Sequence, residues 1–418
     1  MERVSAQQLA EWAAEARARW SVPGLAVGLL YDGETVFAAD GVCELGGDQR
    51  VTPETAFRIA SITKPFTATL ALALVQNRLL ALDEPPAGSR VEATIRQLLS
   101  HQGGLACEWP SALEELGKGG DGLQRIAEEE PPRLPVGPGE LFSYCNVGFW
   151  LVGAAVARAS GLTFPAAMGA RVLEPLDLGA TDFEPRQAAR GHEQAEPGSD
   201  EHVVVDHPYP QTRTPSGGLW SNVQDLLRFA AHHLGGLGPL SRESIQEMQQ
   251  PQIAAPGGSY GLGWFLRQSG GRRIVEHPGS VAGFQSLLLL VPDERFGFAA
   301  LSNSSRGSAA IRDLLERLGL GSTGAPDFTM EPEQLAAFGG TYSGNGMEVE
   351  VAPEDGRLSV AVTSFDPLSG ENVAYPPFLA RPVDEREFEV VDADWRGERL
   401  TFPRDGFVCN GVLATRTE

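Results

Sequence analysis

The sequence predicts an α+β protein followed by a small all-β unit. Segments with strand character open and close the first 320 residues, and helices fill the middle. In such a pattern the first and last segments share one antiparallel sheet. From residue 326 onward the chain holds only short alternating segments, which are typical of a barrel or sandwich. We therefore predict one domain over residues 1–320 and a second over residues 326–418.

The N-terminal segment predicts a helix and a hairpin. Ser5 and Gln8 form a capping-box pattern before an amphipathic helix that ends near Arg19. The dipeptide Asp32-Gly33 is a typical two-residue hairpin turn. The predicted strands flank it: Leu25–Tyr31 and Glu34–Ala39.

The next segments predict buried helices and then strands. Phe66–Leu80 is apolar on nearly every face, which indicates a buried helix. Two more helices are predicted over Val147–Ser160, stopped by Gly161, and from a cap at Ser221 and Gln224 to Leu234. Three strands and a helix to about Leu318 close the domain: Arg272–Glu276, Gly283–Val291 and Phe296–Leu301.

The tail differs in charge and pattern. Gly319–Pro326 has the composition of a linker. The residues from Pro326 to Glu418 include 18 acidic and 7 basic ones, so about half of the net charge of −22 lies there. The tail resembles a lipocalin-like β domain, and its predicted strands are Glu348–Ala352, Arg357–Thr363, Glu387–Val391, Glu398–Phe402 and Gly406–Ala414.

Composition narrows the possible partners and compartment. A net charge of −22 argues against nucleic acid or an anionic membrane as a partner. The N-terminus has no apolar stretch of the kind that a secretory signal needs, so we expect a cytoplasmic protein. The four cysteines are widely spaced, which favours free thiols over disulfides or a metal site. We expect a small-molecule or peptide substrate, no cofactor and no metal, and leave the oligomeric state open.

Only two of the 33 basic residues are lysines, Lys64 and Lys118. Arginine stays charged, whereas a lysine can act as a base when its pKa is lowered. A retained lysine is therefore a candidate for chemistry. Lys118 stands in a Gly-rich stretch, where chance retention on the surface is the simpler explanation.

Ser61-Ile62-Thr63-Lys64 opens the apolar helix. Residues three apart share a helix face, which places the serine hydroxyl beside the lysine amine. A serine needs a neighbouring base to become a nucleophile. Burial in the apolar run would lower the pKa of Lys64. Taken alone, the pattern is more simply explained by an N-cap serine with an unrelated lysine.

Two further motifs complete an ordered set. Tyr144-Cys145-Asn146 lies at a loop-to-helix junction, where Tyr144 could shuttle a proton and Asn146 could bind substrate. His277-Pro278-Gly279-Ser280 follows the end of a predicted strand. Gly279 would let a substrate backbone approach, and the Ser280 N–H could form an oxyanion hole with that of Ser61. Alone, the first motif is more simply explained by a core tyrosine with a turn asparagine. The alternative for the second motif is a β-turn with an exposed histidine.

Together the three motifs resemble the serine β-lactamase and penicillin-binding-protein superfamily, in its class C β-lactamase, D-peptidase and family VIII esterase branch. The resemblance covers roughly Ala6 to Leu318 and implies a β-lactamase/transpeptidase-like fold. It extends to four further segments, which are Phe57–Ala60, Leu98–Leu105, Pro215–Ser221 and Tyr260–Trp264.

The resemblance implies roles for these residues. Ser61 would form an acyl-enzyme, Lys64 and Tyr144 would share acid and base duty, and Asn146 would contact the substrate. His277 and Pro278 stand where β-lactamases carry lysine and threonine, which weakens a β-lactamase reading. Cys145 stands where a small residue is usual and is interpreted as packing.

Three functions remain in competition. The leading hypothesis is a carboxylesterase or peptidase that acts through an acyl-enzyme. The second hypothesis is a β-lactamase or D-amino-acid-specific peptidase, and the third is a non-catalytic ligand-binding protein on the same fold. The stretch from Glu184 to Pro215 is expected to be a solvated loop beside the site. Its polar residues fit no standard zinc spacing: His192, His202, Asp206 and His207.

Overall fold

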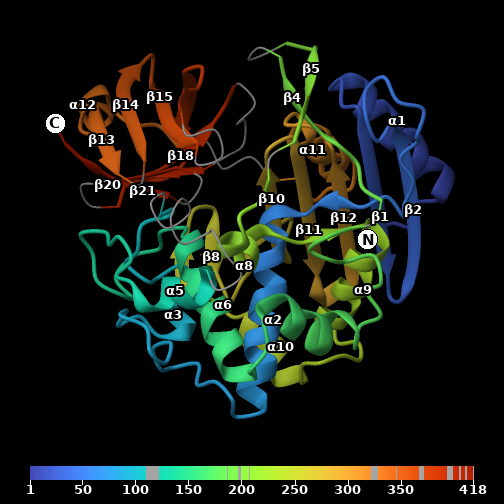
Figure 1. The fold of residues 1–418 in the computed structure, drawn as a ribbon. Helices are drawn as coiled ribbons and strands as arrows, with labels where there is room; N and C mark the ends of the chain where they lie inside the picture. Colours follow the sequence, from blue (N-terminus) through green and yellow to red (C-terminus); the bar gives the residue numbers. More distant parts are fainter. Residues whose placement is uncertain are drawn as a thin grey trace.

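The computed structural model of the chain contains two large sheets and a helical layer (Figure 1). It describes residues 1–109, 122–185, 187–195, 199–206, 208–321, 328–344, 346–366, 371–392, 399–403, 406–409 and 412–417. The first sheet has eight strands in the order β2-β1-β12-β11-β10-β9-β8-β7. Strands from both ends of the predicted first domain thus share one sheet, as the sequence predicted.

The N-terminal helix and hairpin form as predicted. Helix α1 spans Ala6–Arg19, and its N-cap Ser5 accepts a hydrogen bond from the backbone N–H of Gln8. Strands β1 and β2 pair along their length, and Asp32 and Gly33 both adopt the positive φ angles that a tight hairpin turn requires. These strands span Gly24–Tyr31 and Glu34–Gly41.

The sheet closes between residues far apart in the sequence. Strand β1 pairs antiparallel with β12, which places Leu25 opposite Ser302. The later strands and the helix that follows them are β7 (Ile253–Ala255), β8 (Gly258–Tyr260), β9 (Phe265–Ser269), β10 (Arg272–Val281), β11 (Phe284–Val291), β12 (Phe296–Ser302) and α11 (Gly307–Arg317).

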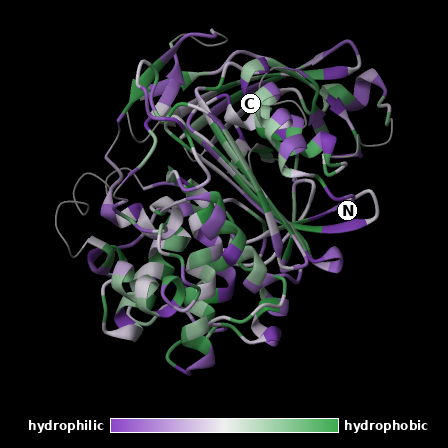
Figure 2. Cartoon of the chain, turned by 90° about the vertical axis from the view of Figure 1, so that its right-hand side faces the viewer, coloured by the Kyte–Doolittle hydropathy of each residue, from purple (hydrophilic) through white to green (hydrophobic). Residues whose placement is uncertain are grey.

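Both faces of the sheet are buried. Alternate residues of β11 pack to opposite sides: Leu287 and Leu289 pack with α1 and α11, whereas Leu288 and Leu290 pack with the helical layer. This two-sided burial explains the unbroken apolar run in β11. Figure 2 shows hydrophobic residues concentrated along the central strands.

Helices α2, α6 and α9 form the centre of the helical layer. They span Thr63–Gln76, Asn146–Ser160 and Val223–His233. The shorter elements of the first domain are β3 (Phe57–Arg58), η1 (Ala60–Ile62), α3 (Ile95–Leu99), α5 (Gly122–Glu128), α7 (Phe164–Met168), η2 (Gly169–Leu173), β4 (Gly191–Gln194), β5 (His202–Val205), η3 (Gln211–Arg213), α8 (Thr214–Gly217), β6 (Trp220–Ser221), α10 (Arg242–Met248) and η4 (Pro292–Glu294).

Several element boundaries differ from the prediction, among them those of α2, α9 and β10. Helix α2 ends before Leu80, because Arg78 adopts a left-handed φ of 59°. The cap of α9 is Asn222, which accepts from the N–H of Asp225, whereas Ser221 belongs to β6. Strand β10 continues to Val281, so the His277 motif lies inside a strand and not at its end.

The C-terminal unit is an all-β barrel. Its strand order is β14-β13-β21-β20-β19-β18-β17-β15-β16, and an additional pairing of β14 with β15 closes the ring. The prediction of one strand over Gly406–Ala414 is wrong, because Gly406–Cys409 and Val412–Arg416 are two separate strands that pair antiparallel. The elements are α12 (Pro332–Ala336), β13 (Gly340–Gly344), β14 (Met347–Glu354), β15 (Arg357–Asp366), β16 (Glu371–Ala374), β17 (Phe378–Pro382), β18 (Glu387–Val390), β19 (Arg399–Thr401), β20 (Gly406–Cys409) and β21 (Val412–Arg416).

The barrel has its own apolar core and touches the first domain at defined points. The N–H of Leu413 donates to the hydroxyl of Ser143, and Glu387 accepts from the N–H of Gly257. Leu320, inside the predicted linker, is buried in the core of the first domain. The position of the domain boundary stays a prediction.

Among the described residues, no single helix is long and apolar enough to cross a membrane. One bent pair, Asn146–Ser160 with Phe164–Leu176, passes on length and composition alone, with 74° between its halves.

Candidate active site

Ser61 lies in a short 3₁₀ turn directly before α2. Ala60, its neighbour, has a φ of 46°, a strained value for a residue with a side chain. This turn lets the chain pass from β3 into α2 with Ser61 partly exposed and Lys64 fully buried. The Nζ atom of Lys64 lies 3.0 Å from the Oγ of Ser61, as the three-residue spacing predicted.

Burial lowers the pKa of Lys64 to about 7. Burial is the largest cause of this value; the positive charge of Arg213 contributes to the lowering, while Glu108 acts in the opposite direction. Nζ also donates to the carbonyl oxygen of Ser216 at 2.9 Å, which aims the amine at Ser61. A substantial share of the amine is therefore neutral near pH 7, when its lone pair can accept the serine proton.

Tyr144 lies close to both of these groups. Its phenol interacts with the Ser61 side chain, and the Nζ of Lys64 lies 4.7 Å from the centre of its ring. Burial raises the pKa of Tyr144 well above its usual value. The phenol is thus protonated near neutral pH and can pass a proton between Ser61 and a departing group.

The loop that carries Tyr144 is held by a histidine that sequence reasoning gave no role. The N–H of Cys145 donates to Nδ1 of His101 at 2.9 Å, and the His101 ring packs 4.2 Å from the ring of Tyr144. Cys145 caps α6 by accepting from Gly148, and burial raises its pKa to about 12. Its thiol therefore stays protonated, in agreement with the packing interpretation.

Asn146 is the first residue of α6 and faces a carboxylate. Its side-chain N–H donates to Glu108, and the same carboxylate oxygen accepts from Arg213 at 2.9 Å. Sequence reasoning missed Glu108 and Arg213, because nothing in their local pattern marks them. They hold the Asn146 amide so that its oxygen faces away from the carboxylate.

His277 is placed differently from its predicted position. Its side chain is completely buried, whereas Pro278 and Ser280 on either side of Gly279 are exposed. Nδ1 of His277 lies 2.7 Å from the carbonyl oxygen of Pro278, so it carries the proton, and Nε2 accepts from the hydroxyl of Tyr260 at 3.0 Å. Burial lowers the pKa of His277 to about 3, so its ring is neutral near pH 7.

Packing within the protein requires a glycine at position 279. A Cβ atom there would lie 2.2 Å from the carbonyl oxygen of Ile59 and 2.3 Å from Oγ of Ser286. The absent side chain lets β10 lie directly against the segment that leads into Ser61. Ser280, one residue further, is therefore held close to the nucleophile, and its hydroxyl accepts from Gln285 at 2.9 Å. The pairing of the Ser280 and Ser61 N–H groups stays a prediction.

The stretch from Glu184 to Pro215 is more than the predicted solvated loop, because its described residues include the paired strands β4 and β5. His192 is fully buried, with one ring nitrogen 2.8 Å from the carbonyl oxygen of Asn303 and the other accepting from Leu45. His202 contacts Ser304, and His207 lies outside the described residues. Among the described residues, no three histidine, cysteine or acidic side chains come together as a metal site would require.

The fold and this arrangement define a serine hydrolase of the β-lactamase and penicillin-binding-protein superfamily. The chain belongs to the Beta-lactamase family, whose model matches residues 9–320.

Known proteins resemble the chain at moderate identity. Penicillin-binding protein 4 of Amycolatopsis lactamdurans is 29% identical over 370 residues, which is 79% of this chain and 95% of the relative. The crystal structure of SurE, solved also with D-Leu, has a TM-score of 0.78 at 24% identity and covers 99% of both chains. A D-amino acid amidase from Ochrobactrum anthropi has a TM-score of 0.61 at 23% identity over 71% of this chain and 90% of its own. The last two likenesses show the fold.

Proposed function

We propose that the protein hydrolyses esters or amides through an acyl-enzyme on Ser61, as a carboxylesterase or peptidase. The observation that carries this proposal is the pair formed by Ser61 and Lys64, in which a buried amine with a pKa of about 7 lies 3.0 Å from the hydroxyl. A non-catalytic binding protein has no need of this pair.

The neutral His277 argues against β-lactams as good substrates. β-Lactams carry a carboxylate beside the reactive amide, on the leaving-group side. An imidazole whose pKa is lowered to about 3 offers no positive charge to it. Arg272, at the start of the same strand, is paired with Glu294. We expect neutral esters to be better substrates than nitrocefin.

A second candidate is a D-amino-acid-specific peptidase or amidase. It is supported by the likeness over 99% of the chain to a structure solved with D-Leu, and by the likeness to a D-amino acid amidase. Matched D- and L-alanyl p-nitroanilides separate it from a general esterase. A D-over-L ratio well above one supports the second candidate, and equal rates support the first.

The test of the nucleophile uses a fluorophosphonate probe and a p-nitrophenyl ester. Wild-type protein should be labelled on Ser61, found by peptide mass spectrometry, and Ser61→Ala should lose about 10⁴–10⁶ in kcat. The variant Ser305→Ala, a serine outside this site, is the matched control. Turnover of Ser61→Ala within tenfold of wild type would refute the proposal.

A further inference from the structure

His101 holds the backbone on both sides of Tyr144 with two hydrogen bonds. Its carbonyl oxygen accepts from the backbone N–H of Ser143 at 2.9 Å, and its Nδ1 atom accepts from the N–H of Cys145 at 2.9 Å. These two donors belong to the residues directly before and after Tyr144. A single residue, 43 positions earlier in the chain, thus fixes the segment that carries the phenol.

An unusual backbone conformation accompanies these two bonds. His101 has a φ of 58°, in the left-handed region that few residues with a side chain adopt; asparagine, aspartate and histidine adopt it most readily. In this conformation the carbonyl oxygen and the side chain both reach the segment Ser143–Cys145. Such strained residues persist where the surrounding structure holds them, and they gather at functional sites.

The imidazole also packs against the phenol ring itself. The ring centres of His101 and Tyr144 are 4.2 Å apart. The ring centres of Phe265 and His277 are further from that of Tyr144, at 6.4 and 6.3 Å. His101 is 1% exposed, so this contact is sealed from solvent. The histidine therefore touches the phenol ring as well as the backbone beside it.

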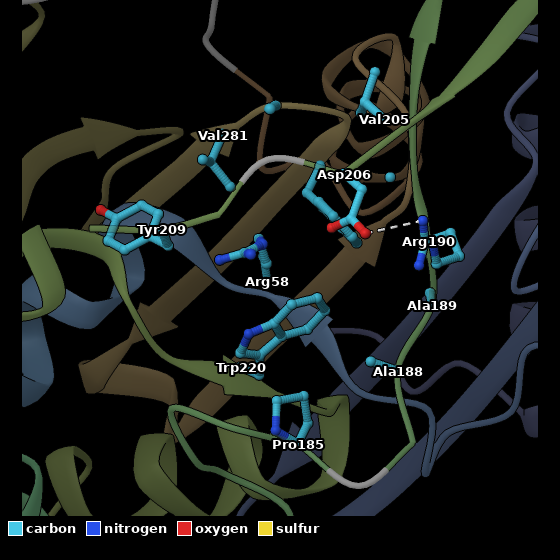
Figure 3. Close-up of a pocket in the computed structure, with 13 residues that line it drawn as sticks. Arg58, Pro185, Ala188, Ala189, Arg190, Val205, Asp206, Tyr209, Trp220 and Val281 are labelled. Carbon is cyan, nitrogen blue, oxygen red and sulfur yellow. Dashed lines mark ion pairs between the residues drawn. The ribbon is translucent and has the colours of Figure 1, made fainter. Parts of the chain in front are cut away.

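Figure 3 shows a cavity of about 320 Å³ that is separate from this contact. Arg58, Tyr209 and Trp220 are among the residues that line it. The described part of its lining includes neither His101 nor Tyr144. A phenol ring that lost its imidazole neighbour would therefore not border this free volume.

Packing alone does not explain a histidine at this position. Because Nδ1 accepts from an N–H, the proton of the neutral ring lies on Nε2. Nε2 is buried and has no hydrogen-bond partner among the residues that the structure describes. A phenylalanine would fill similar space without burying an unpaired donor, which destabilises a protein. The property that histidine adds is the acceptor for the N–H of Cys145.

The ring stays uncharged while it does this. Burial, and then the positive charge of Lys64, lower the pKa of His101 well below its ordinary value. The imidazole is therefore neutral near pH 7, and Nδ1 keeps the lone pair that accepts from Cys145.

We propose that His101 is a positioning residue that holds the Tyr144 phenol where it can give a proton to the departing group. This inference rests on the proposed acyl-enzyme function and adds a residue to its proton-transfer step. In acylation the Ser61 oxygen bonds to the acyl carbon, and the bond from that carbon to the leaving oxygen breaks. Lys64 takes the serine proton, and Tyr144 gives its own proton to the leaving oxygen and regains one from Lys64. His101 exchanges no proton and acts through Tyr144.

The test compares two acetate esters whose leaving groups differ in basicity. Ethanol must be protonated as it leaves, whereas p-nitrophenol departs as an anion, so a misplaced phenol should slow ethyl acetate far more than p-nitrophenyl acetate. His101→Phe keeps a ring and removes the acceptor. Its kcat/KM should fall by about 10² for ethyl acetate and by less than about tenfold for p-nitrophenyl acetate. His101→Asn should restore part of the loss, because its amide oxygen can accept from Cys145 and asparagine tolerates the left-handed φ.

A double-mutant cycle shows whether the effect passes through Tyr144. In a Tyr144→Phe background, His101→Phe should change the ratio of the two kcat/KM values by less than about twofold. His101→Gly adopts the left-handed φ without strain and also lacks the acceptor, so it gives a second measurement if phenylalanine prevents folding. It should shift the ratio in the same direction as His101→Phe.

His233→Asn is the matched control. His233 is a buried histidine of α9 whose Nε2 lies 3.1 Å from the hydroxyl of Thr69, so its loss should affect both esters alike. A ratio in the His101 variants equal to that of wild type, or one that shifts equally in the Tyr144→Phe background, would overturn the inference. Absence of turnover and of Ser61 labelling in the wild type would instead refute the proposed function.

Discussion

Gly279 lies against Ile59 so closely that a Cβ atom on the glycine would be 2.2 Å from the isoleucine carbonyl oxygen. The hydroxyl of Ser286 donates to the same oxygen at 2.9 Å. Strands β10 and β11 are thus fastened to the segment that ends in the nucleophile, and the distance between Ser61 and Ser280 depends on a missing side chain.

Gly279→Ala should therefore damage catalysis more than stability. A methyl group would push β10 away from Ser61, and a shift of about 1 Å at a reacting group can cost about 10² in rate. Overpacking would cost about 1–3 kcal/mol of unfolding free energy. Ester turnover and thermal melting measure the two effects. Gly179→Ala, at a glycine with free space around it, is the control. Normal turnover in Gly279→Ala would show that the contact does not position the site.

The lowered pKa of Lys64 predicts how kcat/KM depends on pH. Its pKa is lowered to about 7, so the amine is mostly charged below pH 6 and mostly neutral above pH 8. Because only the neutral amine accepts a proton, kcat/KM should rise with pH, with a midpoint near 7. Lys64→Arg should lose at least about 10³ at every pH, because arginine does not deprotonate. A flat profile from pH 5.5 to 8.5 would show that Lys64 is not the base.

His277 predicts how β-lactam activity can be introduced. His277→Lys should raise the ratio of nitrocefin to ester turnover by about tenfold or more, because it supplies a cation for the carboxylate. Since the pKa of His277 is lowered to about 3, wild type gains no charge at pH 6, and the advantage should already be present there. His277→Gln is the neutral control. Efficient nitrocefin hydrolysis by wild type would place another cation at the site.

The buried histidines predict instability in acid. The pKa of His277 is lowered to about 3 by burial and that of His101 is also lowered, while in the unfolded chain both stay near 6.5. The unfolded state thus binds protons that the native state does not bind, so the free energy of unfolding falls as the pH drops below 6.5. Each such histidine contributes a slope of about 1.4 kcal/mol per pH unit. Urea unfolding at pH 6.5, 5.5 and 4.5 should show a shallower slope for His277→Gln than for wild type.

The barrel predicts the result of a truncation. Its apolar core is separate from the two cores of the first domain, so a chain ending shortly after Leu320 should fold and bind a fluorophosphonate. Leu320 must be kept, because it is buried in the first domain. Loss of the contact between Leu413 and Ser143, next to Tyr144, should change kcat/KM for large substrates more than for small ones. An insoluble product would mean that the two units depend on each other.

The sequence predicted the elements whose cause is local. The hairpin at Asp32-Gly33, the cap at Ser5 and the spacing of Ser61 and Lys64 follow from turn chemistry and helix periodicity, and all appear in the structure. The sharing of one sheet by both ends of the first domain followed from the order of the elements.

The sequence could not predict features that arise from distant contacts. The burial of His277 could not be predicted, because a motif carries no information on burial, which here comes from Tyr260 and the neighbouring strands. Glu108 joins the site through Arg213, a residue 105 positions away. The close approach of Gly279 to Ile59 likewise needs the assembled sheet, so its glycine was attributed to substrate.

The pairing of β1 with β12 affects the nascent chain during its synthesis on the ribosome. Leu25 cannot meet Ser302 until the intervening residues have been made, which at about 5–20 residues per second takes tens of seconds. During this time the edge of β1 that later pairs with β12 has no partner strand. Its backbone N–H and C=O groups could then pair with a strand of another chain. Synthesis speed and chaperone supply should therefore govern the soluble yield of this protein more than its final stability does.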